Sequence, residues 1–311
     1  MLFFQALAAW AQAYNSLLFN LAIQGVCGLS LYITLMAGQL SLANAGFFLI
    51  GAYTAAISSK LGFGYPWDLL LVALLSAVTA VVVGLPALRL RGVYLALATL
   101  GFGEVVAVVA RNLVLPRGCI ERACIANGAV GVFGVPRDAR HWHVYLVLAL
   151  LGYFFYRLER SRVGRALAAI REDELVAGTM GINATYYKVL AFGIGAVIAG
   201  IAGGMWVHFN NQVDPRSAGF TQAINFLAYA VIGGTTTFVG PLVGAVFLYT
   251  LPEALRFLRD YRLMTVGLLL ALAAVFAPRG ILDPALWRQF SLRRPAPQPA
   301  ALPRRQSDAG S

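Results

Sequence analysis

The sequence predicts an all-α polytopic integral membrane protein with about eight transmembrane helices. Of its 311 residues, 59% are hydrophobic and only 12% are charged, about half the charged share of a soluble domain. A soluble fold of this size would lack the polar surface needed to cover its core. Apolar runs recur along most of the chain, and many are long enough to cross a hydrocarbon layer about 30 Å thick as a helix.

The expected spans follow one another between turn residues and charged segments. In chain order they cover residues 16–36, 45–58, 67–88, 93–109, 144–156, 190–207, 239–251 and 263–276, and a short apolar segment lies at 223–232. Residues 1–280 therefore form the expected membrane domain, and the segment 157–188 lies between two of its spans. Residues 281–311 are rich in arginine and proline, a composition typical of a disordered tail.

Basic residues predict how the spans are oriented, because cytoplasmic loops carry an excess of Lys and Arg. The turn at 89–91, the segment 157–188 and the tail are all basic and fall on one side, which we expect to be the cytoplasm. The loop 111–141 falls outside, although it carries five arginines. The net charge of +11 thus reflects membrane orientation; no basic stripe with interleaved aromatics indicates nucleic-acid binding.

Small residues recur at every fourth position in two of the expected helices. They are Gly195, Ala199 and Gly203 in one, and Gly240 and Gly244 in the other. In lipid, such residues let helix backbones approach closely. Tight packing of the bundle is the simpler interpretation, and a face that slides during a functional cycle is the alternative.

The segment 157–188 carries most of the internal charge and has its own helical pattern. Ser161 suits the N-cap of a short helix. Val163, Leu167 and Ile170 share one face of that helix. An apolar stripe with ordered helix ends favours a docking surface for a partner protein over a solvated linker.

A second short helix follows in the same segment. The acidic run 172–174 suits its first turn, where the helix dipole favours negative charge. Gly181 suits its C-terminal end. The residues expected at the docking surface are Arg165, Ile170, Arg171, Glu172, Asp173, Glu174 and Gly181.

Several polar residues lie at membrane depth. Glu104 sits inside an expected span, where an ionisable group is costly and usually faces the bundle interior or a water-filled cavity. It either locks helices together or lines a path. Gln39, Ser41 and Asn44 interrupt an apolar run, so they line a path or form a turn, and Asn225 is a similar candidate.

The sequence offers no site for covalent chemistry or for a metal. It contains no nucleophile–base pair, no paired catalytic carboxylates and no Gly-Lys-Ser/Thr phosphate-binding loop. Cys119 and Cys124 share a polar loop but lack enough neighbouring ligands for a metal ion. We expect His141, His143 and His208 at the surface or in loops.

Four stretches in matching order resemble the LivM-type permeases of branched-chain amino acid ABC importers. Residues 161–182, SRVGRALAAIREDELVAGTMGI, resemble the cytoplasmic loop that couples such permeases to their ATPases. Three further signatures are resembled by GQLSLANAGFF at 38–48, RLRGVYLALATLGFGE at 89–104 and VGPLVGA at 239–245. The sequence departs from the family pattern at Thr235–Thr237, where a glycine is usual.

The resemblance implies a permease subunit in the bacterial inner membrane that moves branched-chain or other hydrophobic amino acids. It implies as partners a second, LivH-like permease, two ATP-binding subunits, an extracytoplasmic substrate-binding protein and membrane lipid. ATP is then the cofactor of the partner subunits, since this chain has no phosphate-binding loop. Two alternatives are the same architecture with urea, amides or aromatic acids as cargo, and a stand-alone ion-coupled carrier that uses Glu104 as its ion site.

Overall fold

The computed structural model describes residues 15–115, 126–254 and Gly267. The tail at 281–311, Cys119 and Cys124 lie outside the described residues, as does the expected span at 263–276 except for Gly267. The secondary structure of the described part is almost entirely helical. Its α-helices are α2 (Asn15–Met36), α3 (Asn44–Lys60), α4 (Trp67–Ala87), α5 (Val93–Asn112), α6 (His141–Glu159), α7 (Arg162–Glu172), α8 (Glu174–Thr179), α9 (Ala184–Asn210), α10 (Phe220–Gly233) and α11 (Val239–Ala254).

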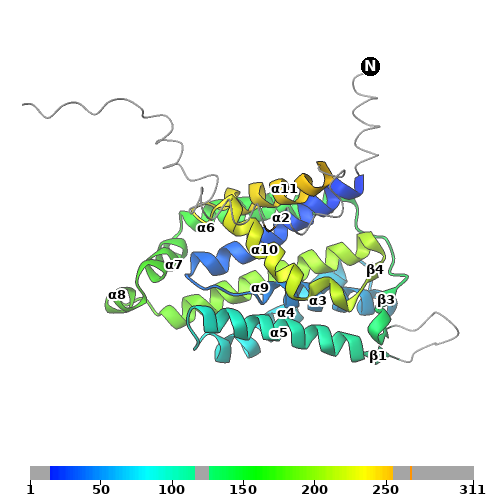
Figure 1. The fold of residues 1–311 in the computed structure, drawn as a ribbon, viewed down its shortest axis with the longest axis horizontal. Coiled ribbons are helices and arrows are strands. Elements are labelled where there is room, and N and C mark those ends of the chain that lie inside the picture. The colour runs from blue at the N-terminus through cyan, green and yellow to red at the C-terminus, as the bar shows by residue number, and fades with distance from the viewer. Residues whose placement is uncertain (1–14, 116–125, 255–266, 268–311) are drawn as a thin grey trace, which may run out of the picture.

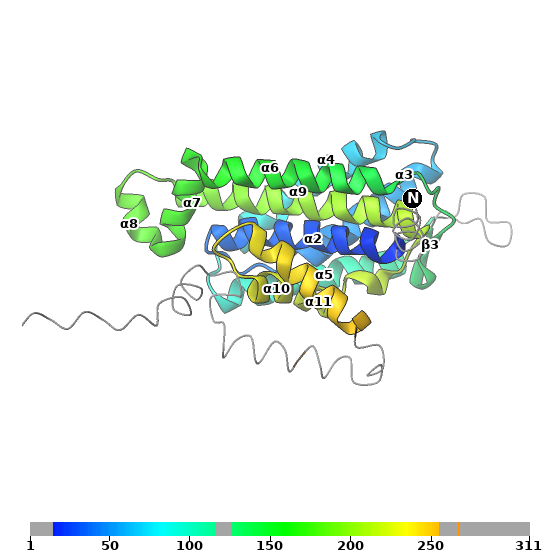
Figure 2. The same cartoon turned by 90° about the horizontal axis from the view of Figure 1, so that it is seen from above.

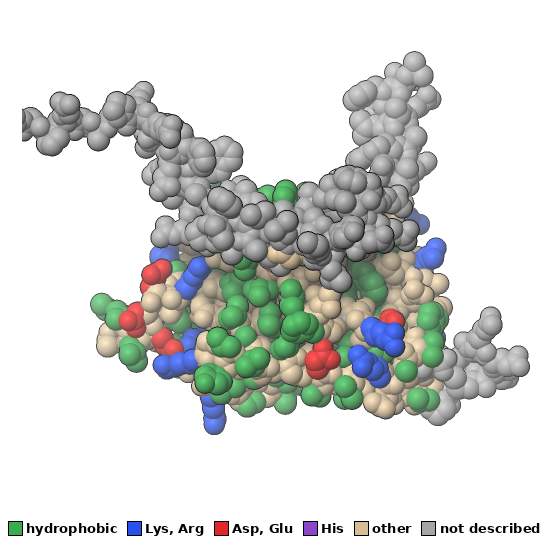
Figure 3. Space-filling model, viewed as in Figure 1, with side chains coloured by type: hydrophobic (Ala, Val, Ile, Leu, Met, Phe, Trp, Pro, Cys, Tyr) green, Lys and Arg blue, Asp and Glu red, His purple; other side chains and the backbone are tan. Residues whose placement is uncertain are grey.

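The longer helices form one bundle, and α7 and α8 project from one of its ends (Figures 1 and 2). Four of the described helices, α2, α4, α5 and α9, are each long and apolar enough to cross a membrane. Figure 3 shows that most charged side chains on the visible face lie toward the two ends, with a largely hydrophobic stretch between them. The predicted all-α membrane fold is confirmed.

Short strands occupy the end of the bundle opposite α7 and α8 (Figure 1). The pairs are antiparallel: β1 (Val114–Leu115) with β2 (Ala126–Asn127), and β3 (Val132–Phe133) with β4 (Gln212–Val213). Two 3₁₀ turns accompany them, η1 (Gly128–Val130) and η2 (Pro215–Ala218). The β3–β4 pair joins the long loop after α5 to the chain that leaves α9.

Helix α9 is central and α4 is peripheral. α9 packs against α2, α3 and α4, and 61% of its most apolar stretch is buried, against 22% for α4. The outer face of α4 exposes Leu70, Leu74 and Val82. In water such a face would be costly, so it is a surface suited to lipid.

The small residues predicted on α9 lie where it touches its neighbours. Ala199 is fully buried. A Cβ at Gly195 would lie 2.7 Å from the carbonyl oxygen of Ser30 in α2, and one at Gly203 would overlap the carbonyl oxygen of Phe48 in α3. Backbones of α2, α3 and α9 therefore approach more closely than side chains would allow.

The same close approach joins α10 to α11. A Cβ at Gly240 would overlap the carbonyl oxygen of Gly234, and one at Gly244 would overlap that of Tyr229. Gly234 itself has φ +100°, a conformation that glycine adopts without steric cost. The two helices are thus held side by side directly after the turn that connects them.

The basic turn at 89–91 and the segment 157–188 lie at the same end of the bundle, as their shared charge predicts. Glu174 of α8 forms an ion pair with Arg91 of that turn. The loop 111–141 lies at the opposite end, to the extent that it is described (Figure 1). The grouping of basic segments used to orient the chain therefore agrees with the fold.

Candidate functional site

Helix α7 begins as predicted, but its apolar stripe faces inward. The Ser161 hydroxyl accepts a hydrogen bond from the Gly164 N–H at 3.1 Å, which caps the helix. Leu167 is 1% exposed and Ile170 is 4% exposed, and Val163 and Leu167 join the buried cluster at the centre of the bundle. The prediction that this stripe serves a partner protein is wrong, because the bundle itself covers it.

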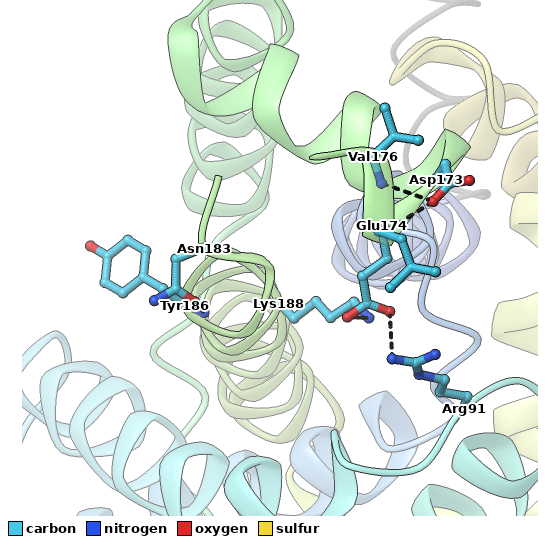
Figure 4. Close-up of polar contacts among 8 residues, drawn as sticks. Arg91, Asp173, Glu174, Val176, Asn183, Tyr186 and Lys188 are labelled. Carbon is cyan, nitrogen blue, oxygen red and sulfur yellow. Dashed lines mark hydrogen bonds and ion pairs between the residues drawn. The ribbon is translucent and has the colours of Figure 1, made fainter. Parts of the chain in front are cut away.

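Helix α8 follows after a single residue and has ordered ends. Oδ1 of Asp173 accepts hydrogen bonds from the N–H groups of Leu175 at 2.8 Å and Val176 at 3.1 Å (Figure 4). Gly181 ends the helix with φ +79°, and the N–H of Ile182 donates to the carbonyl of Ala177. Both helix ends that the sequence predicts here are confirmed.

The exposed apolar surface of this segment lies on α8 and on the residue directly after it. Leu175 is 74% exposed, Val176 is 55% exposed and Met180 is 78% exposed, whereas Ala177 is buried. Sequence reasoning missed these three side chains because it assigned docking to the stripe on α7. Apolar residues on a very short helix inside a charged segment were the available signal.

Glu174 joins α8 to two parts of the bundle. Its carboxylate lies 2.8 Å from Nζ of Lys188 in α9 and 3.5 Å from Nη2 of Arg91 in the turn between α4 and α5. Figure 4 shows Glu174 between these two cations. The Lys188 side chain is 14% exposed, so this half of the network is partly shielded from water.

Arg171 joins the end of α7 to the turn between α10 and α11. Its Nη1 donates to the carbonyl oxygen of Thr235 and its Nη2 to the hydroxyl of the same residue, both at 3.0 Å. This double contact uses the planar fork of the guanidinium. The threonine hydroxyl supplies an acceptor that a glycine at this position would lack.

Glu159, the last residue of α6, holds the same end of the bundle together. Its Oε1 accepts hydrogen bonds from the Tyr32 hydroxyl at 2.7 Å and from the Phe238 N–H at 2.8 Å. One carboxylate therefore joins α2, α6 and the residue that precedes α11. The other predicted docking residues are exposed: Arg165 donates to the carbonyl of Arg160, and Glu172 ends α7.

The structure separates the polar residues that interrupt the apolar run after α2. Asn44 donates from Nδ2 to the Ser30 hydroxyl at 2.9 Å, and the Ser41 hydroxyl accepts from the Ala43 N–H at 3.3 Å. Ser41 belongs to the turn between α2 and α3, and Asn44 is the first residue of α3. Gln39 differs: it is 2% exposed, neither amide atom has a hydrogen-bond partner among the described residues, and it lines a cavity beneath α7 and α8.

Glu104 joins two helices. Its Oε1 accepts a hydrogen bond from the Phe220 N–H at 2.9 Å, so a carboxylate from α5 caps the start of α10. An anion at a helix N-terminus is favoured by the unpaired N–H groups there. Asn225 lies on α10, half-buried. Within the described residues, the structure places no three metal-binding side chains together.

A family model described as branched-chain amino acid transport system / permease component matches residues 14–274. This range covers most of the chain. The chain belongs to this permease family. The resemblance of its four sequence stretches to such permeases is therefore confirmed.

Relatives of this permease carry names that agree with the family. The high-affinity branched-chain amino acid transport system permease protein LivM of Salmonella typhimurium is 34% identical over 284 residues, which are 83% of this chain and 67% of LivM. LivM of Escherichia coli strain K12 is 31% identical over 293 residues, with the same coverage. LivH of the same strain is 33% identical over 144 residues, 45% of this chain and 46% of LivH. No solved structure matches.

The permease also contains a buried polar pair that sequence reasoning missed. We expected His208 at the surface, but it and Asp68 are both 0% exposed, and Nε2 of His208 contacts Oδ2 of Asp68. Nδ1 of His208 lies 3.0 Å from the Pro136 carbonyl oxygen. Burial and the nearby Asp68 carboxylate raise the pKa of Tyr65, in the loop before α4, to about 12. Asp68, an acidic residue at the start of an apolar helix, was the available signal.

Proposed function

We propose that this permease is the translocation subunit of an ATP-driven importer of branched-chain or other hydrophobic amino acids in the bacterial inner membrane. The names of its LivM and LivH relatives support this cargo and a second, LivH-like permease as partner. Two ATP-binding subunits and an extracytoplasmic substrate-binding protein complete the proposed assembly. ATP is bound on the partner subunits, because the chain has no phosphate-binding loop.

The observation that carries the proposal is the exposed apolar tip of α8. The side chains of Leu175, Val176 and Met180 are exposed at the end of the bundle, and without a partner protein they would contact water. Apolar side chains presented on a short capped helix suit a hydrophobic groove on a partner protein. The ATPase is the proposed owner of that groove.

Polar contacts connect this tip to the helices that would move. Force on α8 would reach α9 and the α4–α5 turn through Glu174, and the α10–α11 turn through Arg171. In the proposed cycle, closure of the ATPases on ATP tilts these helices and alternates access to a central path. A liganded binding protein docks on the opposite end of the bundle.

The test is co-purification of the chain with its ATPase and second permease, followed by uptake into proteoliposomes. We expect Leu175→Asp combined with Met180→Asp to reduce ATPase recovery at least tenfold and to abolish ATP-driven leucine uptake. Phe63→Asp is the matched control, since Phe63 is an exposed apolar residue in the loop that follows α3, away from α8. It should leave ATPase recovery unchanged.

Other outcomes would identify the alternatives. Uptake by the purified chain without any ATPase would contradict the proposal and favour an ion-coupled carrier. Uptake that urea, amides or aromatic acids compete for, and leucine does not, would retain the architecture and change the cargo.

A further inference from the structure

Gln39 is a buried amide whose hydrogen-bonding capacity is unused. Its side chain is 2% exposed, and neither Oε1 nor Nε2 has a partner among the described residues. Buried polar groups in native proteins are nearly always paired, because leaving them unpaired costs free energy. An orphaned amide that lines a cavity therefore indicates that the cavity receives a polar ligand or water.

The cavity beside Gln39 has room for a small organic molecule. Its volume is about 140 Å³, close to that of a protein cavity known to hold benzene. It lies between the bundle and the α7–α8 segment, at the end that the basic segments assign to the cytoplasm. At Gly38, φ is +70°, and a Cβ there would lie 3.1 Å from Cα of Arg171, so α7 comes very close to the cavity wall.

Charged groups of both signs line this cavity. Arg91, Arg171 and Lys188 contribute three cations, and Glu174 contributes one carboxylate. Glu174 already contacts Lys188 at 2.8 Å, while its 3.5 Å contact with Arg91 is longer and the Arg91 side chain is 72% exposed (Figure 4). The excess of positive charge suits a ligand carboxylate. Glu174 and Oε1 of Gln39 suit a ligand ammonium group.

The rest of the wall is aliphatic. Leu88, Leu95 and Ile170 line the cavity beside these polar groups. The lining therefore combines a carboxylate-binding side, an ammonium-binding side and an apolar side. A simple anion such as phosphate would leave the apolar side and the Glu174 carboxylate without a matching group.

We propose that this cavity binds a free α-amino acid with a small aliphatic side chain, entering from the cytoplasmic face. The identity of the ligand rests on the proposed function, since the released cargo of a branched-chain amino acid importer is such a molecule. The ligand carboxylate lies toward Arg91 and Lys188, and its ammonium group lies toward Glu174 and Gln39. The site thus lies where released cargo arrives, against the residues that tie α8 to the bundle.

Equilibrium binding of radiolabelled leucine to the full chain in lipid nanodiscs, without binding protein, tests this site. We expect saturable binding that Gln39→Leu and Lys188→Met each weaken at least tenfold. Lys60→Met is the matched control, because Lys60 is the other lysine of the chain and ends α3 at the opposite end of the bundle. It should bind leucine as the wild type does.

Competition on the wild-type chain keeps the test decisive if a variant fails to fold. 4-Methylpentanoate lacks the ammonium group and isopentylamine lacks the carboxylate, so neither should displace leucine at concentrations where unlabelled leucine does. Displacement by phosphate as effectively as by leucine would overturn the proposal in favour of a general anion site. So would a wild-type chain that binds no leucine, or variants that both bind it normally.

Failure of this site is distinguishable from failure of the proposed function. ATP-driven leucine uptake by the assembled importer, together with no binding at Gln39 and Lys188, would overturn the site alone. Binding that depends on these residues in a chain whose assembly imports no leucine would support the site and contradict the proposed function alone.

Discussion

Asp68 and His208 are 140 positions apart in the sequence and form a contact from which solvent is excluded. A carbonyl oxygen can only accept a hydrogen bond, so Nδ1 of His208 carries a proton and donates to the carbonyl oxygen of Pro136. The second ring nitrogen faces the Asp68 carboxyl group, and one proton lies between them. This pair joins the first turn of α4 to the end of α9.

Removing one member of this pair should destabilise the protein. Asp68→Ala leaves the His208 ring buried without its partner, and we expect a loss of about 3–5 kcal/mol. Asp68→Asn keeps a donor that reaches Nε2, so its loss should be smaller. Thermal unfolding in detergent measures both. The exposed Glu172 is the control: Glu172→Ala should change stability by no more than about 0.5 kcal/mol, and an Asp68→Ala variant as stable as this control would contradict the assignment.

The helices were predictable because hydrophobic runs and their interruptions are local. The run 93–109 became α5, which extends to Asn112, and the run 144–156 became α6, which begins at His141 and ends at Glu159. The helices are longer than the runs because polar residues at helix ends can stay helical while they meet water. Hydropathy marks the apolar centre of a span and not its termini.

Contacts between distant segments were not predictable from one sequence. Ile170 belongs to an apolar stripe whatever covers it, so its pattern could not distinguish the bundle from a partner protein. Asp68 and His208 each looked ordinary alone, and only the packing of α4 on α9 reveals them as a pair. Gln39 was singled out by its polarity, but its place beneath α7 depends on the turn that follows α2.

The double contact between Arg171 and Thr235 should matter for coupling more than for stability. Exposed polar pairs contribute at most about 1 kcal/mol, so Arg171→Lys should leave the assembled importer stable. A lysine cannot reproduce the two-pronged contact, and we expect leucine uptake per ATP hydrolysed to fall severalfold. Thr235→Val keeps the backbone acceptor and should have a smaller effect. If the two changes act through one contact, the variant that carries both will take up no less leucine than Arg171→Lys alone.

Close approach of α3 and α9 makes Gly203 sensitive to a single methyl group. A Cβ there overlaps the carbonyl oxygen of Phe48, so Gly203→Ala should cost about 1–3 kcal/mol through forced separation of the helices. Gly193 lies on the same helix with nothing within 4 Å of such a Cβ. Gly193→Ala should therefore be neutral, or stabilising by up to about 1 kcal/mol through helix propensity. Equal thermal unfolding midpoints for the two variants would show that a methyl group at position 203 does not force α3 and α9 apart.

Substitution of Glu104 separates a structural role from an ion site. The Phe220 N–H needs only an acceptor oxygen, which glutamine also provides, so Glu104→Gln should retain most ATP-driven uptake. Glu104→Leu removes the cap from α10 and should cost about 1 kcal/mol or more of stability, with reduced uptake. Leucine uptake and thermal unfolding are measured for both Glu104 variants on the same preparations. An ion-coupled mechanism requires a titratable group, so a Glu104→Gln variant that is fully stable and transports nothing would show that the carboxylate takes part in transport itself.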